Sequence, residues 1–282
     1  MILSGKAKLA GVLGWPVGHS RSPRLHGYWL DRHGIDGAYL PLPVRPQAFG
    51  SVLAALVELG FRGVNVTVPH KQAALTACHE IDPDAERIGA VNTVVISGGR
   101  TRGSNSDGYG FLENLRQGAP GWQAASGPAV VLGAGGAARA VVAALLDAGA
   151  PEIRLVNRTR TRAEALAKAL GRPLSGPLTI VDWSERQAQL QDAAVLVNTT
   201  TLGMAGGQPL DLDLDRLPGA ALVNDIVYTP LETPLLAAAR ARGNPVVDGL
   251  GMLLHQARPG FAAWFGVEPE VTEELRRFVL AE

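Results

Sequence analysis

Short strand-like and helix-like segments alternate along almost the whole chain of 282 residues, and this alternation restricts the folds that are open to it. Apolar residues at every second position indicate strands, whereas apolar residues at helical spacing indicate helices. Strands that alternate with helices are typical of largely parallel sheets whose faces are covered by helices. The sequence therefore predicts an α/β fold.

The alternation occurs in two series, with a break in the pattern at Gly118–Gly121. In the first series we expect a hairpin that starts with 91–96 and turns at 98–99, strands at 9–14, 39–43 and 63–68, and helices at 22–33, 47–59, 72–79, 83–88 and 107–117. In the second, more regular series we expect strands at 129–132, 153–156, 178–181, 195–198 and 221–225, and helices at 137–148 and 163–170. The remainder is predicted to be helical, at 252–264 and 270–280, and could pack back on the first series.

Charge and composition exclude several classes of protein. Lys and Arg number 26 and Asp and Glu also number 26, so the chain lacks the basic surplus of a nucleic-acid binder. The single cysteine, Cys78, excludes an internal disulfide framework, fits a reducing compartment and reads as a small packing residue. No apolar run reaches the ~18 residues of a membrane span, and Met1–Lys6 lacks the layout of a signal peptide. We expect a soluble, cytoplasmic protein that binds a small molecule and neither nucleic acid nor membrane.

A glycine-rich turn opens the second series. The apolar strand 129–132 is followed directly by Gly133-Ala134-Gly135-Gly136-Ala137-Ala138 and then by a helix. This is the G-x-G-x-x-A pattern in the strand–turn–helix context that dinucleotide binding requires. Gly133 would allow the tight turn, Gly135 would let the pyrophosphate approach the main chain, and Ala138 would keep the helix close to the sheet. A purely structural turn is the alternative.

The next strand of this series distinguishes between two dinucleotides. A protein that binds NAD usually has Asp or Glu at the end of this strand, where the carboxylate binds the ribose 2′-hydroxyl. Asn157 occupies that place here, and Arg158, Arg160 and Arg162 follow it. A guanidinium group suits a 2′-phosphate, so the sequence predicts NADP, with Arg158 as the main contact. The alternative is a solvated, basic start to the next helix.

The segment Val64–Lys71 predicts a strand that brings polar side chains to the edge of a sheet. Its three valines alternate with Asn65 and Thr67, so we expect the valines to pack on a core and the polar side chains to share the other face. Pro69 cannot donate to a sheet ladder and should end the strand. Lys71 follows just past the strand end, where ligands bind in α/β folds, and is a candidate acid or base. An ordinary surface lysine is the alternative.

Other candidate site residues have competing structural explanations. Ser22 precedes Pro23 at a predicted helix start and can be explained as an N-cap, whereas Ser20 has no such explanation. Asp107 also stands at a predicted helix start and can be explained in the same way. Asn92 places an amide on the strand of the hairpin. The histidines at 19, 26, 33, 79 and 255 lack metal-ligand spacing, so we interpret them as structural or surface residues and predict no metal site. His255 is adjacent to Gln256 and could line a cleft.

Together these segments resemble the shikimate dehydrogenase family. The resemblance follows the chain in order through Gly14–Pro23, Asn65–Lys71, Gly89–Thr93, Asn105–Gly110, Gly133–Arg139, Asn157–Thr159, Asn198–Met204 and Asp248–Gln256. Each motif is modest, but eight in the same order make the resemblance specific. Ser106 stands where the family usually has threonine and keeps the hydroxyl group.

The resemblance implies an architecture and a set of site residues. The implied fold has an N-terminal α/β catalytic domain, residues 1–106, completed by C-terminal helices in 250–282, and a Rossmann-type NADP-binding domain at 107–249. Lys71 and Asp107 would be the catalytic pair. The implied substrate-binding residues are Ser20, Ser22 and Thr67 for a carboxylate, Asn92 and Gln256 for hydroxyls, and Tyr228. The implied cofactor-binding residues are Gly133, Ala134, Gly135, Gly136, Ala137, Asn157, Arg158, Thr159, Arg162, Thr199, Gly249 and Met252.

The reaction that the resemblance implies is the reversible reduction of 3-dehydroshikimate to shikimate by NADPH, a step of chorismate and aromatic amino acid biosynthesis, in a monomer or homodimer. Two alternatives stay open. A quinate/shikimate dehydrogenase often uses NAD and alters one hydroxyl of the serine pair, so intact Ser20 and Ser22 together with Arg158 favour shikimate and NADP. A non-catalytic NADP-binding regulator should have lost Lys71 or Asp107, and both are present.

Overall fold

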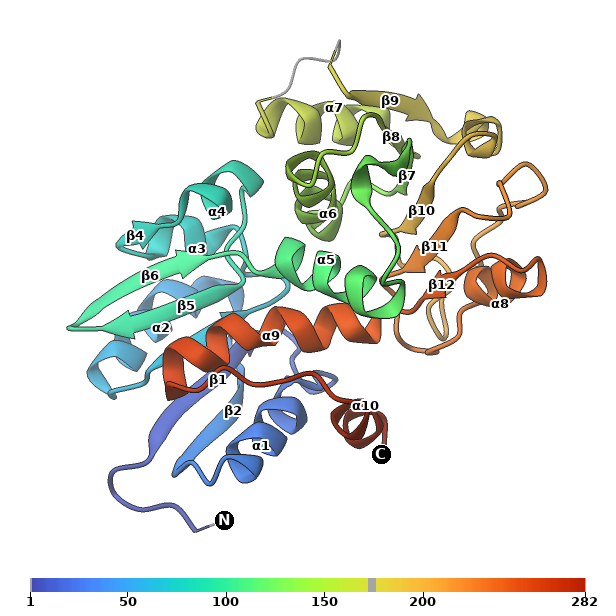
Figure 1. Cartoon of the computed structure of the whole chain (residues 1–282). Helices are drawn as coiled ribbons and strands as arrows, with labels where there is room; N and C mark the ends of the chain where they lie inside the picture. The colour runs from blue at the N-terminus through green and yellow to red at the C-terminus, as the bar shows by residue number, and fades with distance from the viewer. Residues whose placement is uncertain (1, 172–175, 282) are drawn as a thin grey trace. The chain divides into compact units, whose positions relative to one another are not determined.

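A computed structural model describes residues 2–171 and 176–281 of the protein, and it confirms the predicted α/β fold (Figure 1). The chain divides into two compact units. The first ends at Ser106 and resumes at Gln256, and the second runs from Asp107 to His255. None of the helices in the described ranges is long and apolar enough to cross a membrane.

The first unit is built on a six-stranded mixed sheet with the order β2-β1-β3-β5-β6-β4 (Figure 1). β1 runs parallel to β2 and β3, whereas β5 runs antiparallel to both of its neighbours, β3 and β6. The strands are β1 (Lys8–Gly14), β2 (Gly37–Pro43), β3 (Gly63–Val66), β4 (Glu80–Ile81), β5 (Thr93–Ser97) and β6 (Arg100–Ser104). The predicted hairpin is therefore β5 and β6, joined at Gly98 and Gly99, whose positive φ angles of 56° and 74° suit glycine.

Helices of the first unit bury apolar faces against this sheet. They are α1 (Ser22–Arg32), η1 (Pro46–Ala48), α2 (Phe49–Glu58), α3 (Ala73–Ala77), α4 (Pro83–Ile88) and α10 (Glu273–Leu280), and α9 (Leu250–Phe265) carries the chain from the second unit back into the first. One core cluster joins Leu13 of β1 and Val64 of β3 to Phe49 and Leu53 of α2. Because the side chains of β3 are buried, whatever follows this strand starts from a fixed point.

The structure corrects the predicted strand at 63–68. β3 ends at Val66, and Val68, predicted to pack on the core with the other valines, is 70% exposed. The reason is that the chain leaves the sheet at Thr67, whose amide still bonds the Leu13 carbonyl, and turns so that the His70 amide donates to the Thr67 carbonyl. Asn65 is buried, because β3 is a central strand whose four residues are all buried.

The second unit has a six-stranded sheet in which all strands are parallel, in the order β12-β11-β10-β7-β8-β9. The strands are β7 (Ala129–Leu132), β8 (Ile153–Asn157), β9 (Leu178–Asp182), β10 (Val195–Asn198), β11 (Leu222–Asp225) and β12 (Val246–Val247). Numbered from the first strand of this unit, the order is 3-2-1-4-5-6, the doubly wound order of dinucleotide-binding folds. Its direction reverses between β7 and β10, so a ligand site is expected beyond the carboxyl ends of these two strands.

The helices of the second unit are α5 (Asp107–Gly118), α6 (Gly136–Asp147), α7 (Arg160–Ala169) and α8 (Pro234–Ala241), with short turns η2 (Ala124–Ser126), η3 (Trp183–Glu185) and η4 (Ala188–Leu190) (Figure 1). The sequence did not predict α8 or β12. A strand of two residues is too short to show an alternating pattern, and α8 has two turns in which alanines outnumber the larger apolar residues. Buried leucines and valines, among them Leu132, Leu196 and Val223, form a hydrophobic core with this sheet.

Candidate functional site

Polar residues gather at one edge of the first unit's sheet. Ser20 follows β1, Thr67 and Lys71 follow β3, and Ser106 follows β6. Asn92 precedes β5, which runs in the opposite direction, so the start of β5 lies at the same edge as the ends of β1, β3 and β6. The structure thus brings to one edge five residues from four separate segments of the sequence, and Asp107 follows directly after Ser106 as the first residue of α5.

The helix start at Ser22 differs from the prediction. The N-cap of α1 is Arg21, and no side chain caps this helix. Ser22 is already inside the first turn and buried, because the chain enters helical geometry one residue earlier than Pro23 suggested. The Ser20 hydroxyl instead accepts a hydrogen bond from the Ser22 amide at 3.3 Å. The prediction of Ser22 as an N-cap was therefore wrong, and its hydroxyl is not used for capping.

The turn that carries Lys71 is rigidly held by its neighbours. The His70 side chain donates from Nε2 to the Val44 carbonyl at 2.7 Å and stacks on Phe49 with ring centroids 4.9 Å apart. The Lys71 carbonyl accepts a hydrogen bond from the Val91 amide at 2.9 Å. The Lys71 side chain is half-buried and starts from a main chain that is fixed on both sides. This setting differs from that of an ordinary exposed lysine.

Asn92 lies at the centre of a buried hydrogen-bond network. Its side-chain oxygen accepts from the Ser106 amide and from the Thr93 hydroxyl, each at 2.9 Å. Its side-chain amide donates to Oε1 of Gln256 at 3.3 Å, and the Ser106 hydroxyl donates to the Gln256 carbonyl at 2.8 Å. The network therefore brings Asn92 and Gln256 together although 164 positions separate them in the chain. Ser106, noted in the sequence only as a departure, links the two.

Asn65 and Tyr39 also belong to this network and, like Thr93 and Ser106, were not among the predicted site residues. Asn65 is buried and donates from Nδ2 to the Asn92 carbonyl at 3.1 Å and to the Thr93 hydroxyl at 3.2 Å. The Tyr39 hydroxyl of β2 donates to Oδ1 of Asn65 at 2.6 Å. The signal for Asn65 was present, because an amide on a buried central strand must be hydrogen-bonded. The sequence contains no comparable signal for Tyr39.

In the second unit the glycine-rich turn lies where the strand order reverses. Gly133 has φ of 103°, and a Cβ there would lie 2.8 Å from Oγ1 of Thr199, whose hydroxyl donates to the Leu132 carbonyl at 2.6 Å. Gly135 is the N-cap of α6, and a Cβ on Gly135 or on Gly136 would meet no atom within 4 Å. Open space therefore lies beside the first-turn amides of α6, which fits the close approach of a pyrophosphate group.

The end of β8 presents arginines in two different states. Arg160 is engaged in salt bridges with Glu164 at 3.1 Å and with Asp182 at 3.0 Å. Arg158 and Arg162 are exposed, and neither forms a salt bridge with another residue in the described part of the chain. The two exposed guanidinium groups can accept a phosphate without giving up a carboxylate partner. The Asn157 side chain donates to the Thr159 carbonyl at 2.7 Å and shapes this turn.

Asp225 organises the carboxyl ends of β10 and β11. Its carboxylate accepts hydrogen bonds from Nδ2 of Asn198 at 3.0 Å, from the Thr233 hydroxyl at 2.7 Å and from the Val227 amide at 3.0 Å. Burial raises the pKa of Asp225, and these hydrogen bonds act in the opposite direction. Tyr228 follows three residues after this strand and is half-buried. Asp225 was not among the site residues predicted from the sequence.

The start of α9 packs tightly in the second unit. A Cβ on Gly249 would collide with the carbonyl of Ile226, so this glycine has a packing reason as well as its predicted cofactor role. Met252 is buried in the first turns of α9. The Asn114 side chain of α5 donates to the Asp248 carbonyl at 2.7 Å, which holds the entry to α9 in place.

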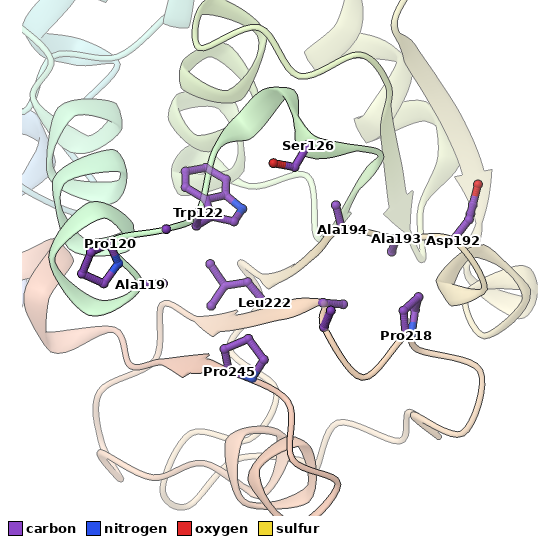
Figure 2. Close-up of a pocket in the computed structure, with 13 residues that line it drawn as sticks. Ala119, Pro120, Trp122, Ser126, Asp192, Ala193, Ala194, Pro218, Leu222 and Pro245 are labelled. Carbon is purple, nitrogen blue, oxygen red and sulfur yellow. The ribbon is translucent and has the colours of Figure 1, made fainter.

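Figure 2 shows a cavity of about 550 Å³ in the second unit that none of the predicted site residues lines. It lies at the amino ends of the strands, since Ala194 precedes β10, Leu222 begins β11 and Pro245 precedes β12. The glycine-rich turn lies at the carboxyl end of β7, which is the opposite edge of the same parallel sheet. This cavity is therefore separate from the predicted dinucleotide site. Its lining consists of Ala119, Pro120, Gly121, Trp122, Ser126, Asp192, Ala193, Ala194, Pro218, Ala220, Ala221, Leu222 and Pro245.

Comparisons with known proteins agree over both units. The family model of the shikimate dehydrogenase substrate binding domain matches residues 12–94, and that of shikimate / quinate 5-dehydrogenase matches residues 119–202. The chain is 64% identical to the shikimate dehydrogenase (NADP(+)) of Paramagnetospirillum magneticum over 280 residues, which covers 99% of this chain and 100% of that protein.

Solved structures are similar over almost the entire chain. Shikimate 5-dehydrogenase from Thermus thermophilus, in complex with NADP(H) and shikimate, is 40% identical with a TM-score of 0.85, and the match covers 97% of this chain and 100% of that one. Quinate dehydrogenase from Corynebacterium glutamicum, in complex with NAD, is 33% identical with a TM-score of 0.87, and the match covers 97% of each chain.

Proposed function

The chain belongs to the shikimate dehydrogenase family, and we propose that it catalyses the reversible, NADP-dependent reduction of 3-dehydroshikimate to shikimate. The observation that carries the proposal is the convergence of hydroxyl, amide and ammonium groups from separate segments at one edge of the first sheet. We assign substrate binding to the first unit and NADP binding to the second.

The substrate carboxylate is bound by the hydroxyls of Ser20, Ser22 and Thr67. Neutral donors satisfy the lone pairs of a carboxylate when they are preorganised, and two features here preorganise them. Ser22 is buried within the first turn of α1, and Thr67 is held to β1 through its amide. Asn92 and Gln256, already joined by a hydrogen bond, bind substrate hydroxyls, and Tyr228 approaches the same substrate.

The NADP pyrophosphate is bound by the glycine-rich turn and the 2′-phosphate by the arginines after β8. The open space at Gly135 and Gly136 and the exposed guanidinium groups of Arg158 and Arg162 support this assignment. The proposed cofactor residues are Gly133, Ala134, Gly135, Gly136, Ala137, Asn157, Arg158, Thr159, Arg162, Thr199, Gly249 and Met252. When bound, the nicotinamide supplies or accepts the hydride.

Lys71 manages the one proton that the reaction requires. In the direction of reduction, negative charge develops on the substrate carbonyl oxygen; the Lys71 ammonium stabilises it and donates a proton to that oxygen. In the direction of oxidation, the neutral amine removes the proton from the hydroxyl. Asp107 orients the Lys71 ammonium and a substrate hydroxyl. The fixed main chain on both sides of Lys71 supports this role, because proton transfer depends on placement within hydrogen-bond reach.

The experiment that tests the proposal measures absorbance in the reduced-nicotinamide band with purified protein. Shikimate and quinate are each supplied with NADP and with NAD. We expect rapid reduction of NADP by shikimate and slow reactions with the other three pairs. Comparable rates with quinate or NAD would favour a quinate/shikimate dehydrogenase, which is the alternative raised by the similarity to the quinate enzyme. Binding of NADP without turnover of either substrate would indicate a regulator.

A further inference from the structure

His26 is a fully buried side chain of α1 that lies against Tyr39 of β2. The two rings are parallel, with an interplanar angle of 4° and centroids 3.9 Å apart. Trp29 meets the imidazole edge-on at 5.7 Å, and Phe261 and Trp264 of α9 lie at 5.8 Å and 5.7 Å. The imidazole is thus enclosed by aromatic rings, and the closest and most parallel of them is that of Tyr39.

An imidazole in this buried position is unfavourable for stability. Neither ring nitrogen makes a hydrogen bond with any residue in the described ranges. Burial lowers the pKa of His26 to about 3, while the Asn65 side chain acts in the opposite direction to a smaller extent. The ring is therefore neutral near pH 7, and its buried nitrogens are a cost to stability. In this cluster the ring therefore presents a flat, uncharged face to Tyr39.

Tyr39 connects this cluster to the residues proposed to bind substrate. Its hydroxyl donates to Oδ1 of Asn65, which in turn donates to the Asn92 carbonyl. Burial raises the pKa of Tyr39 well above its usual range, and a side-chain hydrogen bond with Ser22 acts in the opposite direction. The Tyr39 hydroxyl is thus held by Asn65 on β3.

The stacking of the His26 and Tyr39 rings limits the directions in which the Tyr39 hydroxyl can donate. A phenolic O–H group prefers the plane of its ring, because the oxygen is conjugated with the ring. A flat imidazole packed parallel to that ring holds the plane, and with it the direction of the O–H group toward Asn65. Without this surface the phenol ring can tilt, so that the hydrogen bond from its hydroxyl to Asn65 lengthens.

We propose that His26 is a positioning residue of the substrate site, which acts by stacking on Tyr39 and so holds Asn65, and through it Asn92, in place for the substrate. This inference rests on the proposed function, because it takes Asn92 as a group that binds shikimate. His26 itself does not touch the substrate in this account.

The test compares two substitutions that differ in one property. His26→Phe keeps a flat ring against Tyr39, whereas His26→Leu removes it, and His26→Met is made in parallel in case the leucine variant does not fold. We expect His26→Leu to raise KM for shikimate about 5- to 10-fold, with kcat within about threefold and KM for NADP unchanged. His26→Phe should keep KM for shikimate within about twofold of the wild type.

A control separates positioning from loss of stability. Leu25→Ala removes a fully buried side chain from the same helix and should lower stability without moving KM for shikimate, since partial unfolding reduces the amount of active enzyme but not the affinity of the remainder. In a double-mutant cycle, adding His26→Leu to Tyr39→Phe should raise KM by less than about twofold, because the hydroxyl through which His26 acts is already absent.

Three results would overturn the inference. An active His26→Leu enzyme with the wild-type KM for shikimate would exclude a positioning role, and so would an equal rise in KM for Leu25→Ala. An undiminished effect of His26→Leu in the Tyr39→Phe background would exclude action through Tyr39. Wild-type protein that neither oxidises shikimate nor binds it in calorimetry would instead overturn the proposed function, and this inference with it.

Discussion

The polar edge of the first unit is made mainly by side chains, whereas that of the second unit is made mainly by the main chain. In the first unit, the buried side chains of Asn65, Asn92 and Ser106 and the half-buried Gln256 bond one another and leave groups for a ligand at the ends of several strands. In the second unit, the edge beyond β7 and β10 is made by main chain and small residues, with open space at Gly135. One edge depends on side-chain atoms that are present, and the other on side-chain atoms that are absent.

This difference predicts opposite sensitivities to substitution. At the first edge, removing a side-chain atom should damage function, because each atom has partners that would be left unsatisfied. At the second edge, adding an atom should damage function, because it fills the space into which a ligand must come. Substitutions at each edge can test this contrast.

Lys71→Met should have the largest effect, because it removes the proposed proton donor and keeps most of the apolar stem. General acid–base catalysis contributes roughly 10²- to 10⁴-fold, so we expect kcat to fall about 10³-fold while the dissociation constant of NADP stays unchanged. Steady-state kinetics and NADP titration check this. Lys6→Met, at an exposed lysine of the same unit, is the matched control and should behave as the wild type. Retention of more than about a tenth of kcat by Lys71→Met would contradict the assigned role.

Gly135→Val should weaken NADP binding at the second edge, because it adds a side chain where there is open space. The backbone of Gly135 has φ of −87° and ψ of −171°, which valine adopts readily, and the new side chain meets no protein atom at its Cβ. We therefore expect a folded protein whose dissociation constant for NADP rises about 100-fold or more, while shikimate binding is retained. Gly219→Val, also in open space within the same unit, is the control. Unchanged NADP affinity would show that the pyrophosphate does not lie at this turn.

Arg158→Ala tests a place where a side chain of the second edge is proposed to bind the cofactor, at the 2′-phosphate of NADP. A charge-assisted hydrogen bond contributes about 1.5–3 kcal/mol, so KM for NADP should rise roughly 10- to 100-fold, whereas KM for NAD should not. Arg160→Ala is the matched control two residues away, because its guanidinium already pairs with Glu164 and Asp182. An equal loss of NADP and NAD affinity in Arg158→Ala would show that this arginine does not read the 2′-phosphate.

The local geometry of the second edge was easier to predict from the sequence than that of the first, because the second edge is made by the main chain and the first by side chains. A main-chain turn is specified by glycines at fixed spacing after a strand, so the pattern at Gly133–Ala138 predicts geometry directly. The α/β alternation also predicted most of the elements of both sheets, since burial and periodicity determine them. Short elements such as β12 showed no periodicity and were not predicted.

Side-chain networks were harder to predict because they depend on tertiary contacts. Ser22 has the sequence of an N-cap, but α1 begins at Arg21 as its cap, and only the surrounding packing decides this. Val68 continues an alternating pattern, yet the chain leaves the sheet before it. Tyr39 and His26 come from a strand and a helix whose sequences do not indicate that the two rings stack. His26, interpreted from the sequence as a structural or surface residue, is fully buried.

The smallest predicted effect concerns pH and also separates the two units. His26 has its pKa lowered by burial to about 3, against 6.5 for the unperturbed group. Above pH 6.5 the imidazole is neutral in both states and has no influence on the pH dependence of stability. Below pH 6.5 the unfolded chain binds a proton that the folded unit does not, so stability falls as pH falls toward 3. Asp225 in the second unit has the opposite sign, because burial raises its pKa and acid relieves the cost of its charge.

Acid should therefore loosen the first unit before the second. Between pH 7.5 and pH 5.5 the wild type should lose about 1.4 kcal/mol of unfolding free energy that His26→Phe does not lose, since one unit of pH below the unfolded pKa corresponds to about that amount. Denaturant titrations at the two pH values measure the difference. Hydrogen exchange should place it in peptides from α1 and β2 rather than in those from β11.

The control for this prediction is His33→Phe, at an exposed histidine just beyond the end of α1. Its pH dependence should overlay that of the wild type. If His26→Phe lost as much stability in acid as the wild type, the buried imidazole would have to gain a proton at little cost. The aromatic enclosure around it would then be open to water, and the stack on Tyr39 would not be the rigid surface on which the first edge depends. If exchange instead rose first in β11, the acid-sensitive group would lie in the second unit, and the contrast between the two edges would not extend to their stability.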